Sequence, residues 1–163
     1  MVKIVSKALI KNKSGKYLLL YRGDTHPNFP GHLDLPGGEV ESEETSKTAT
    51  AREVQEETGI CIYPNGLKKL FIKQHKNTKH VLFEIVIDKT EADIPIKLSW
   101  EHKKYHWMTL SELLDANIPE GADSYYIDVI FPILYTDFAR SFFIKINLPN
   151  ILTAPIASLM ISS

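Results

Sequence analysis

Three glutamates near the middle of the chain, Glu53, Glu56 and Glu57, have the spacing of neighbours on one face of an α-helix. Successive helical residues are rotated by about 100°, so positions i, i+3 and i+4 project to the same side. Carboxylates at this spacing repel each other by roughly 0.2–0.5 kcal/mol per pair. A divalent cation would relieve that repulsion, and oxygen ligands without neighbouring Cys or His favour Mg²⁺ or Mn²⁺ over Zn²⁺.

Charge is distributed unevenly around these glutamates. Residues 38–60 contain seven Glu against one Lys and one Arg, a local charge of −5, so the other 140 residues sum to +4. A surface helix with solvated glutamates is the ordinary interpretation of such a segment. The preceding Leu35-Pro-Gly-Gly-Glu39 favours a binding site instead, because two glycines let backbone carbonyls approach a ligand closely.

Apolar runs of strand length predict the sheet that must support this segment. They are mostly rich in Ile, Leu, Val or Phe and are bounded by turn residues. The four expected strands are residues 2–10, 17–21, 67–72 and 81–87. Together with the helical segments between and after them, they indicate one mixed α/β domain.

The glutamates themselves fall in an expected helix over residues 42–58. This stretch has no Gly or Pro, contains several Ala and Glu, and is followed by Gly59 at the position of a helix C-cap. We expect one acidic face on this helix and a packing face opposite to it. Two further helices are expected at residues 110–115 and 124–140.

Composition limits the kinds of protein that this chain can be. Its 163 residues suffice for one domain with its own core, without a disulfide or structural metal. A net charge of −1 argues against binding nucleic acid or an anionic membrane over the whole surface, so an anionic partner must be bound locally. The single cysteine, Cys61, cannot form an intrachain disulfide, and we expect a cytoplasmic location.

The last part of the chain is the segment apolar enough to suggest a membrane. Residues 142–161 contain Lys145 and two prolines, which a lone spanning helix would not tolerate well. We therefore expect no transmembrane segment. Residues 141–163 are interpreted as an apolar C-terminal extension that packs on the same domain or lies at a subunit interface, as in a homodimer.

The motif around the glutamates resembles the Nudix box at every defined position. Gly38 is followed after five residues by Glu44, and after seven more by Arg52-Glu-Val-Gln-Glu-Glu-Thr-Gly-Ile60. Features that extend the resemblance beyond the box are a strand ending in Arg22, a Gly-x-Leu-Asp-Leu-Pro-Gly-Gly approach, and Glu101 six residues before Trp107. The chain is similar to Nudix hydrolases, and we interpret residues 1–140 as the Nudix hydrolase domain.

The resemblance implies an α/β/α sandwich with a mixed β-sheet, and an enzyme that uses Mg²⁺. Nudix hydrolases cleave nucleoside diphosphates linked to another moiety, by attack of water on phosphorus. Carried onto this sequence, the metal ligands would be Glu53, Glu56, Glu57 and the backbone carbonyl of Gly37. Arg52 would pair with one of these glutamates and hold it in one rotamer.

Several residues outside the metal set have two open interpretations. The general base would be Glu53 or Glu101, which is placed like a loop glutamate of similar mutator-type enzymes; an exposed loop carboxylate is the alternative for Glu101. Arg22 would bind phosphate groups or would be an exposed arginine at a strand end. His102 and His106, in the same expected loop as Glu101, would contact substrate or, as is more common for a histidine near an aromatic residue, would be packing or surface residues.

The resemblance indicates the substrate class only broadly. Lys76, Asn77 and Thr78 stand where ADP-ribose pyrophosphatases tend to have a proline and diadenosine-polyphosphate hydrolases a tyrosine. This favours a nucleoside triphosphate, cleaved to the monophosphate and pyrophosphate, with ADP-ribose or a dinucleoside polyphosphate as alternatives. A protein of another class, a nucleotide-binding Nudix module without turnover, is disfavoured because the box retains its glutamates. The expected partner is a small-molecule nucleotide, with no membrane and no stable nucleic-acid complex.

Overall fold

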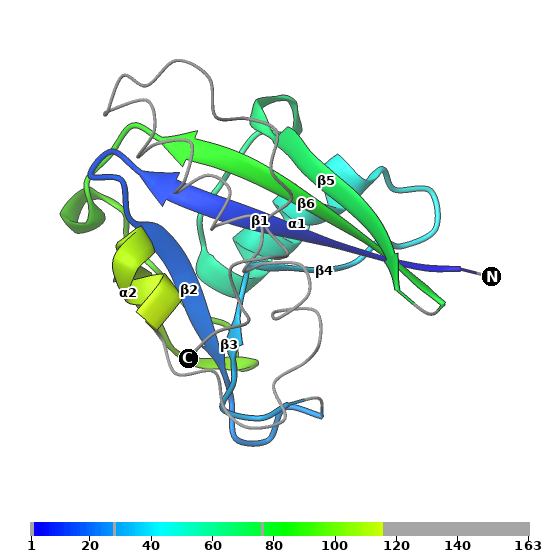
Figure 1. Ribbon diagram of the computed structural model, residues 1–163, viewed down its shortest axis with the longest axis horizontal. Helices are drawn as coiled ribbons and strands as arrows, with labels where there is room; N and C mark the ends of the chain where they lie inside the picture. The colour runs from blue at the N-terminus through cyan, green and yellow to red at the C-terminus, as the bar shows by residue number, and fades with distance from the viewer. Residues whose placement is uncertain (1, 28, 76, 116–163) are drawn as a thin grey trace, which may run out of the picture.

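The chain folds around a mixed β-sheet that has a helix on each side (Figure 1). The computed structural model describes residues 2–27, 29–75 and 77–115. Within these ranges the strands are β1 (Lys3–Asn12), β2 (Tyr17–Arg22), β3 (Leu33–Asp34), β4 (Gly37–Glu39), β5 (Lys68–His75), β6 (Thr78–Ile87) and β7 (His102–Met108). The helices are α1 (Ser46–Thr58) and α2 (Leu110–Asp115), with short 3₁₀ turns η1 (Pro64–Gly66) and η2 (Glu91–Asp93).

Strand β1 lies inside the sheet and pairs with three other strands. β6 runs parallel to it along its whole length, and β5 continues the sheet as an antiparallel neighbour of β6. On its other edge, β1 pairs with β2 where Lys11 faces Tyr17, and with β4 at residues 5–7. β1 and β2 therefore diverge, while β3 and β7 pair with β2 (Figure 1). The parallel pair among antiparallel ones confirms the predicted mixed sheet.

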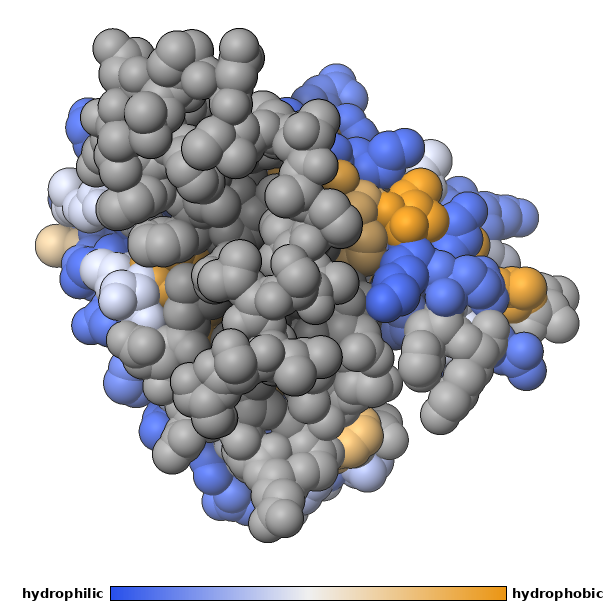
Figure 2. All heavy atoms as spheres, viewed as in Figure 1, coloured by the Kyte–Doolittle hydropathy of each residue, from blue (hydrophilic) through white to orange (hydrophobic). Residues whose placement is uncertain are grey.

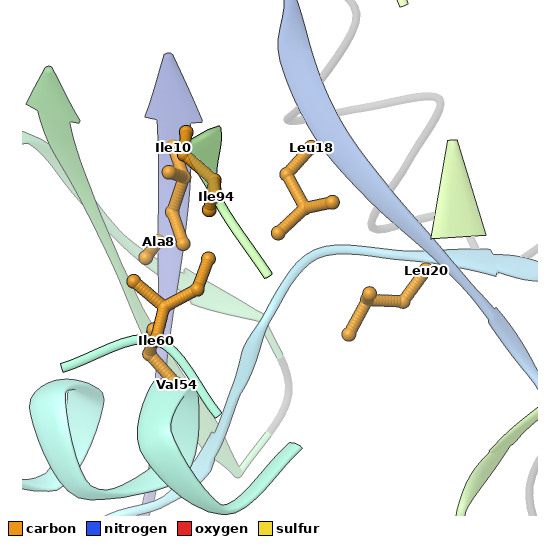
Figure 3. Close-up of a cluster of buried hydrophobic side chains, with 7 residues drawn as sticks. All are labelled: Ala8, Ile10, Leu18, Leu20, Val54, Ile60 and Ile94. Atoms are coloured by element: carbon orange, nitrogen blue, oxygen red, sulfur yellow. The ribbon is translucent and has the colours of Figure 1, made fainter. Parts of the chain in front are cut away.

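Alternate residues of β1 and β2 face opposite sides of the sheet, which builds two cores. One core lies between the sheet and α1 (Figure 3) and includes Ala8, Ile10, Leu18, Leu20 and, from α1, Val54. The other core lies on the α2 side and includes Leu9 and Leu19 from the strands and Leu113 from α2. The sheet thus lies between the two helices, as the predicted α/β/α sandwich requires.

Helix α1 begins four residues later than the sequence predicts. It starts at Ser46 rather than at residue 42, and Thr45 is its N-cap. The Thr45 hydroxyl accepts from the Thr48 backbone N–H, and the Thr48 hydroxyl accepts from the Thr45 backbone N–H. Two backbone N–H groups at the start of the helix, which have no partner within the helix, are thus hydrogen-bonded. At the other end, Gly59 adopts a φ of 73° and is the predicted C-cap.

The four strands predicted from apolar runs are all present, but the sequence does not predict β3, β4 or β7. β3 and β4 have two and three residues, too few for a periodic pattern. β7 occupies the expected loop, and its residues 103–106 are exposed, so the apolar alternation typical of a strand is missing. Helix α2 confirms the prediction at 110–115. The expected helix at 124–140 and the extension at 141–163 lie outside the described residues.

The described surface, seen from the side of Figure 1, is mainly hydrophilic, with hydrophobic side chains in small groups (Figure 2). Large exposed hydrophobic side chains such as Ile72 and Val86 belong to different strands, and such scatter is normal for a protein surface. Among the described residues, no helix is long and apolar enough to cross a membrane.

Candidate active site

The Gly-Gly segment of β4 lies directly against helix α1. The Gly37 backbone N–H donates to Glu57 Oε2 at 2.8 Å. Gly37 has a φ of 132°, and a Cβ there would collide with Ser6 O and Lys7 Cα of β1. A Cβ on Gly38 would lie 2.5 Å from Glu53 Oε1. The backbone of β1 therefore requires glycine at position 37, whereas a side chain at position 38 would displace the Glu53 carboxylate. The hydrogen bond from Gly37 and the closeness of Gly38 to Glu53 join the loop to the acidic helix.

The three glutamates have different environments, although they share one helical face. The exposed fraction of the side chain is 7% for Glu57, 18% for Glu53 and 58% for Glu56. The alternative interpretation, a surface helix with solvated glutamates, therefore does not fit Glu57. Strand β4 covers this residue, because β1 positions β4 next to the last turns of α1.

Burial changes the protonation of the two less exposed glutamates. It raises the pKa of Glu57 to about 8, in part offset by the positive charge of Lys7. Burial also raises the pKa of Glu53 above its usual value, although Arg52 opposes this shift. Glu57 is thus mostly protonated at neutral pH unless another positive charge comes close to it.

Arg52 binds several oxygens around the acidic face. Its Nε donates to Glu44 at 2.9 Å, and Nη1 donates to Glu53 at 3.0 Å and to Glu56 at 3.1 Å. Nη2 also donates to the carbonyl of Glu39 at 3.3 Å. The hydrogen bond to Glu44 raises the pKa of Arg52 above its usual value. The predicted i, i+4 pair with Glu56 is present, and the same guanidinium fixes the positions of Glu53 and Glu44.

A buried ion cluster lies beside these carboxylates. Asp34 Oδ2 accepts from Lys7 Nζ at 3.1 Å and from Arg22 Nε at 2.9 Å, and all three side chains are at most 15% exposed. Burial opposes ionisation of Asp34, but Lys7 and Arg22 outweigh it and lower the pKa of Asp34. The interpretation of Arg22 as an exposed strand-end residue is wrong. The sequence analysis singled out neither Lys7 nor Asp34.

The segment before β7 docks on the last turn of α1. The Ser99 N–H donates to the Glu57 carbonyl at 3.1 Å, and the Lys97 N–H donates to the Thr58 carbonyl at 2.8 Å. Glu101 follows in this segment, with 40% of its side chain exposed, and Oε2 lies 3.8 Å from His26 Nε2. The fold therefore brings residues some 40 positions apart in the sequence to the same end of α1.

The donor set suits a hard divalent cation, although the carboxylates are not gathered around one point. Among the described residues, no three His, Cys, Asp or Glu side chains are close enough to form a metal cluster. Glu53 and Glu56 point to Arg52, while Glu57 points to Gly37. Carboxylate and carbonyl oxygens are nevertheless the ligands that Mg²⁺ and Mn²⁺ prefer, and buried Glu57 would be ionised by a nearby cation.

Between about pH 6.5 and pH 8, the free energy of unfolding of the metal-free protein is expected to fall as the pH rises. The pKa of Glu57 is about 8 when folded against an ordinary 4.5, so the folded state holds an extra proton that it loses in this range. The pKa of His102, lowered by burial to about 4 from 6.5, gives the opposite slope only below pH 6.5. Urea unfolding in EDTA at several pH values measures this free energy. A free energy of unfolding that stays constant or rises from pH 6.5 to 8 would contradict the prediction.

Comparisons with known proteins cover the strands and the helix of this site. The family model of the NUDIX domain matches residues 3–129. The nucleoside triphosphatase NudI of Escherichia coli O139:H28 is 27% identical over 121 residues, which cover 68% of this chain and 85% of that protein. The structure of the MutT protein from Methanosarcina mazei Go1 is 31% identical, with a TM-score of 0.62, and covers 85% of this chain and 94% of that one.

A more distant structure has the same fold. The Ap4A hydrolase of C. elegans, solved as a binary complex, is 20% identical with a TM-score of 0.56. The match covers 84% of this chain and 97% of that chain. At this identity the likeness concerns the arrangement of the sheet and helices.

Proposed function

Because this chain belongs to the NUDIX domain family, we propose that it is a Mg²⁺-dependent pyrophosphohydrolase that cleaves a nucleoside diphosphate linked to another moiety. Members of the family such as the nucleoside triphosphatase NudI are enzymes, and this chain is a Nudix hydrolase. The observation that carries the proposal is the hydrogen bond between the Gly37 N–H and the Glu57 carboxylate. It joins the Gly-Gly segment to the acidic helix, so oxygens from both would be available to one cation.

The residues that would hold the cation are Glu53, Glu56, Glu57 and the carbonyl of Gly37. When bound, Mg²⁺, or Mn²⁺ in its place, would neutralise phosphate charge and lower the pKa of a water molecule. Arg52 orients Glu53 and Glu56 through its two short contacts to them. This arrangement restricts the side-chain rotamers before a cation arrives, which is the role of a residue behind the ligands.

Arg22 would contact the phosphate groups of the substrate. It ends β2 opposite His102, the first residue of β7, and lies next to Gly23, whose N–H donates to the Glu101 carbonyl at 2.6 Å. Arg22 and Glu101 thus lie at one end of the β2–β7 pair, the end that docks on α1. To reach a phosphate, the guanidinium would exchange its contact with Asp34 for one with the substrate.

The proton of the attacking water would go to Glu53 or to Glu101. Burial raises the pKa of Glu53, which suits a base, but Oε1 of Glu53 accepts a hydrogen bond from Arg52. The Glu101 carboxylate is partly exposed and lies 3.8 Å from His26 Nε2. Both residues therefore remain candidates that kinetics must separate.

Glu101→Gln is expected to lower kcat by at least about a hundredfold, the smaller end of what a general base contributes. The amide keeps the size of the side chain but accepts no proton. The measurement is a series of kcat against pH, with Glu91→Gln as the control, since the Glu91 carboxylate in η2 pairs with Lys16 and has no proposed role in the reaction. If the two variants behave alike, Glu101 is not the base and Glu53 becomes the preferred one.

We propose a nucleoside triphosphate as the substrate, cleaved to the monophosphate and pyrophosphate. The relative NudI, a nucleoside triphosphatase, supports this choice because its similarity spans 85% of its length. ADP-ribose and dinucleoside polyphosphates are the alternatives. The proposal also includes a cytoplasmic location and, for residues 141–163, packing on residues 1–140 or on a second subunit.

A substrate screen tests the proposed function. The purified full chain is incubated with Mg²⁺ and, separately, nucleoside triphosphates, ADP-ribose, dinucleoside polyphosphates or capped RNA, and the products are identified by chromatography. Monophosphate and pyrophosphate from a nucleoside triphosphate are expected. Nucleotide binding without turnover of any compound would instead support the non-catalytic module.

A further inference from the structure

His102, the first residue of β7, is buried without hydrogen bonds from its imidazole. The side chain is 1% exposed, and neither Nδ1 nor Nε2 has a hydrogen-bond partner among the described residues. The hydroxyl of Ser99, three residues earlier, is also buried without a hydrogen-bond partner among the described residues. A buried polar group without its hydrogen bond destabilises the folded state. Native proteins rarely leave such groups without a water, an ion or a functional partner.

The imidazole faces a carboxylate of the proposed metal site. His102 Nε2 lies 4.0 Å from Glu57 Oε1, while Glu57 Oε2 accepts from the Gly37 N–H. Two backbone hydrogen bonds connect His102 to the last turn of α1: the Ser99 N–H donates to the Glu57 carbonyl, and the His102 N–H donates to the Ser99 carbonyl at 3.3 Å. They hold the backbone of His102 close to the helix that bears Glu57.

The nitrogen nearest to this carboxylate can be a hydrogen-bond donor. An imidazole carries an N–H on at least one of its two nitrogens. Nε2 is the nitrogen that lies 4.0 Å from Glu57 Oε1, and it has no other hydrogen-bond partner among the described residues. An N–H on Nε2 would therefore face the oxygen of Glu57 that the Gly37 N–H does not bind. A hydrogen bond to a carboxylate oxygen at a metal site helps to orient that ligand.

We propose that His102 is a positioning residue of the metal site, whose Nε2–H donates to Oε1 of Glu57 and orients that carboxylate toward the cation. The inference rests on the proposed function, because it requires Glu57 to be a metal ligand. The Gly37 N–H and the His102 ring would then restrain both oxygens of one carboxylate. Partners of this kind behind a ligand typically change metal affinity by about 10–100-fold.

The first experiment measures Mn²⁺ affinity in the absence of nucleotide, by the electron paramagnetic resonance of free Mn²⁺. His102→Phe keeps a ring but removes the donor, and its Kd for Mn²⁺ is expected to rise at least about tenfold. His102→Gln restores a donor and should return the Kd to within about threefold of the parent. His106→Phe is the matched control, since His106 is an exposed histidine of the same strand, and its Kd should equal that of the parent.

The second measurement uses the unaltered chain and does not depend on the folding of a variant. The ¹⁵N spectrum of the His102 ring in Mg²⁺-saturated protein should show a proton on Nε2. A proton on Nδ1 alone overturns the proposal. So does a Kd that is the same in His102→Phe and the parent, or a rise that His102→Gln fails to reverse.

These outcomes separate the inference from the proposed function. If the parent binds Mn²⁺ and His102→Phe binds it equally well, His102 is not a positioning residue, but the metal-dependent enzyme stands. If the parent binds no Mn²⁺, both are overturned. A purely packing role for His102 would lower the melting temperature of His102→Phe and His102→Gln without a selective change in Mn²⁺ affinity.

Discussion

Glu57→Gln is expected to lower kcat by orders of magnitude while the protein stays folded. The amide has almost the same shape, and its oxygen can still accept from the Gly37 N–H that now contacts Glu57 at 2.8 Å. It has no charge with which to hold a cation. Because burial already raises the pKa of Glu57 to about 8, the folded protein favours a neutral group at this position. Without a bound cation, the variant should therefore be more stable than the parent at pH 7 and above, because Glu57 has to take up a proton on folding at this pH and glutamine does not.

Two other variants make the loss of activity interpretable. Glu56→Gln should also lose activity, because Glu56 is the exposed member of the proposed ligand set. Glu41→Gln removes one negative charge from the same acidic segment, but its carboxylate is 70% exposed and lies 3.9 Å from Arg52. We expect kcat near that of the parent for Glu41→Gln. If Glu56→Gln and Glu57→Gln both stay within a few-fold of the parent, these glutamates are not metal ligands.

Local patterns predicted the parts of this site that lie within one element. The spacing of Glu53, Glu56 and Glu57 and the C-cap at Gly59 depend on helix geometry alone, and α1 contains them as expected. The contact between Arg52 and Glu56 is an i, i+4 pair and equally local. The apolar runs of β1, β2, β5 and β6 predicted strands because each run contains enough alternate or continuous apolar residues.

The parts that the sequence did not predict depend on contacts between distant segments. Glu57 belongs to the acidic face by its position on α1, yet it is buried because β4 is held against it by β1. Most residues of β7 are exposed, so its sequence is largely polar and lacks the apolar alternation of a typical strand. The sequence analysis therefore interpreted this segment as a loop. Its first residue, His102, was expected to be a packing or surface histidine, and only the pairing of β7 with β2 places it beside Glu57.

One signal for the buried ion cluster was present in the sequence. Lys7 interrupts an apolar run, with Val5 before it and Ala8, Leu9 and Ile10 after it. A charged residue in such a strand is seldom fully buried unless it is paired. The structure supplies the partner in Asp34, 27 residues later, on a strand of two residues that no pattern predicts. The sequence thus indicates that a counter-charge exists but not which residue provides it.

Removal of the divalent cation is expected to abolish hydrolysis completely, and added Mg²⁺ or Mn²⁺ should restore it. A polyphosphate carries several negative charges and would approach a segment whose local charge is −5. Three positively charged side chains of the described chain lie near this segment, and each is already paired with carboxylates. Arg52 pairs with glutamates of the Nudix box, and Lys7 and Arg22 pair with Asp34. The positive charge that brings phosphate and carboxylates together must then come from a bound ion.

Initial rates in EDTA, before and after exhaustive dialysis, measure this dependence, with recovery followed as Mg²⁺ is titrated back. Melting temperatures in the same buffers serve as the control, because they separate loss of the cation from loss of the fold. Glu57 provides an internal check: a cation at this site should displace its proton, so binding at pH 7 should release protons in the parent and fewer in Glu57→Gln. Activity that survives chelation and dialysis would falsify the metal-dependent mechanism. The positive charge at the phosphate groups would then have to come from a side chain such as Arg22, released from its ion pair with Asp34.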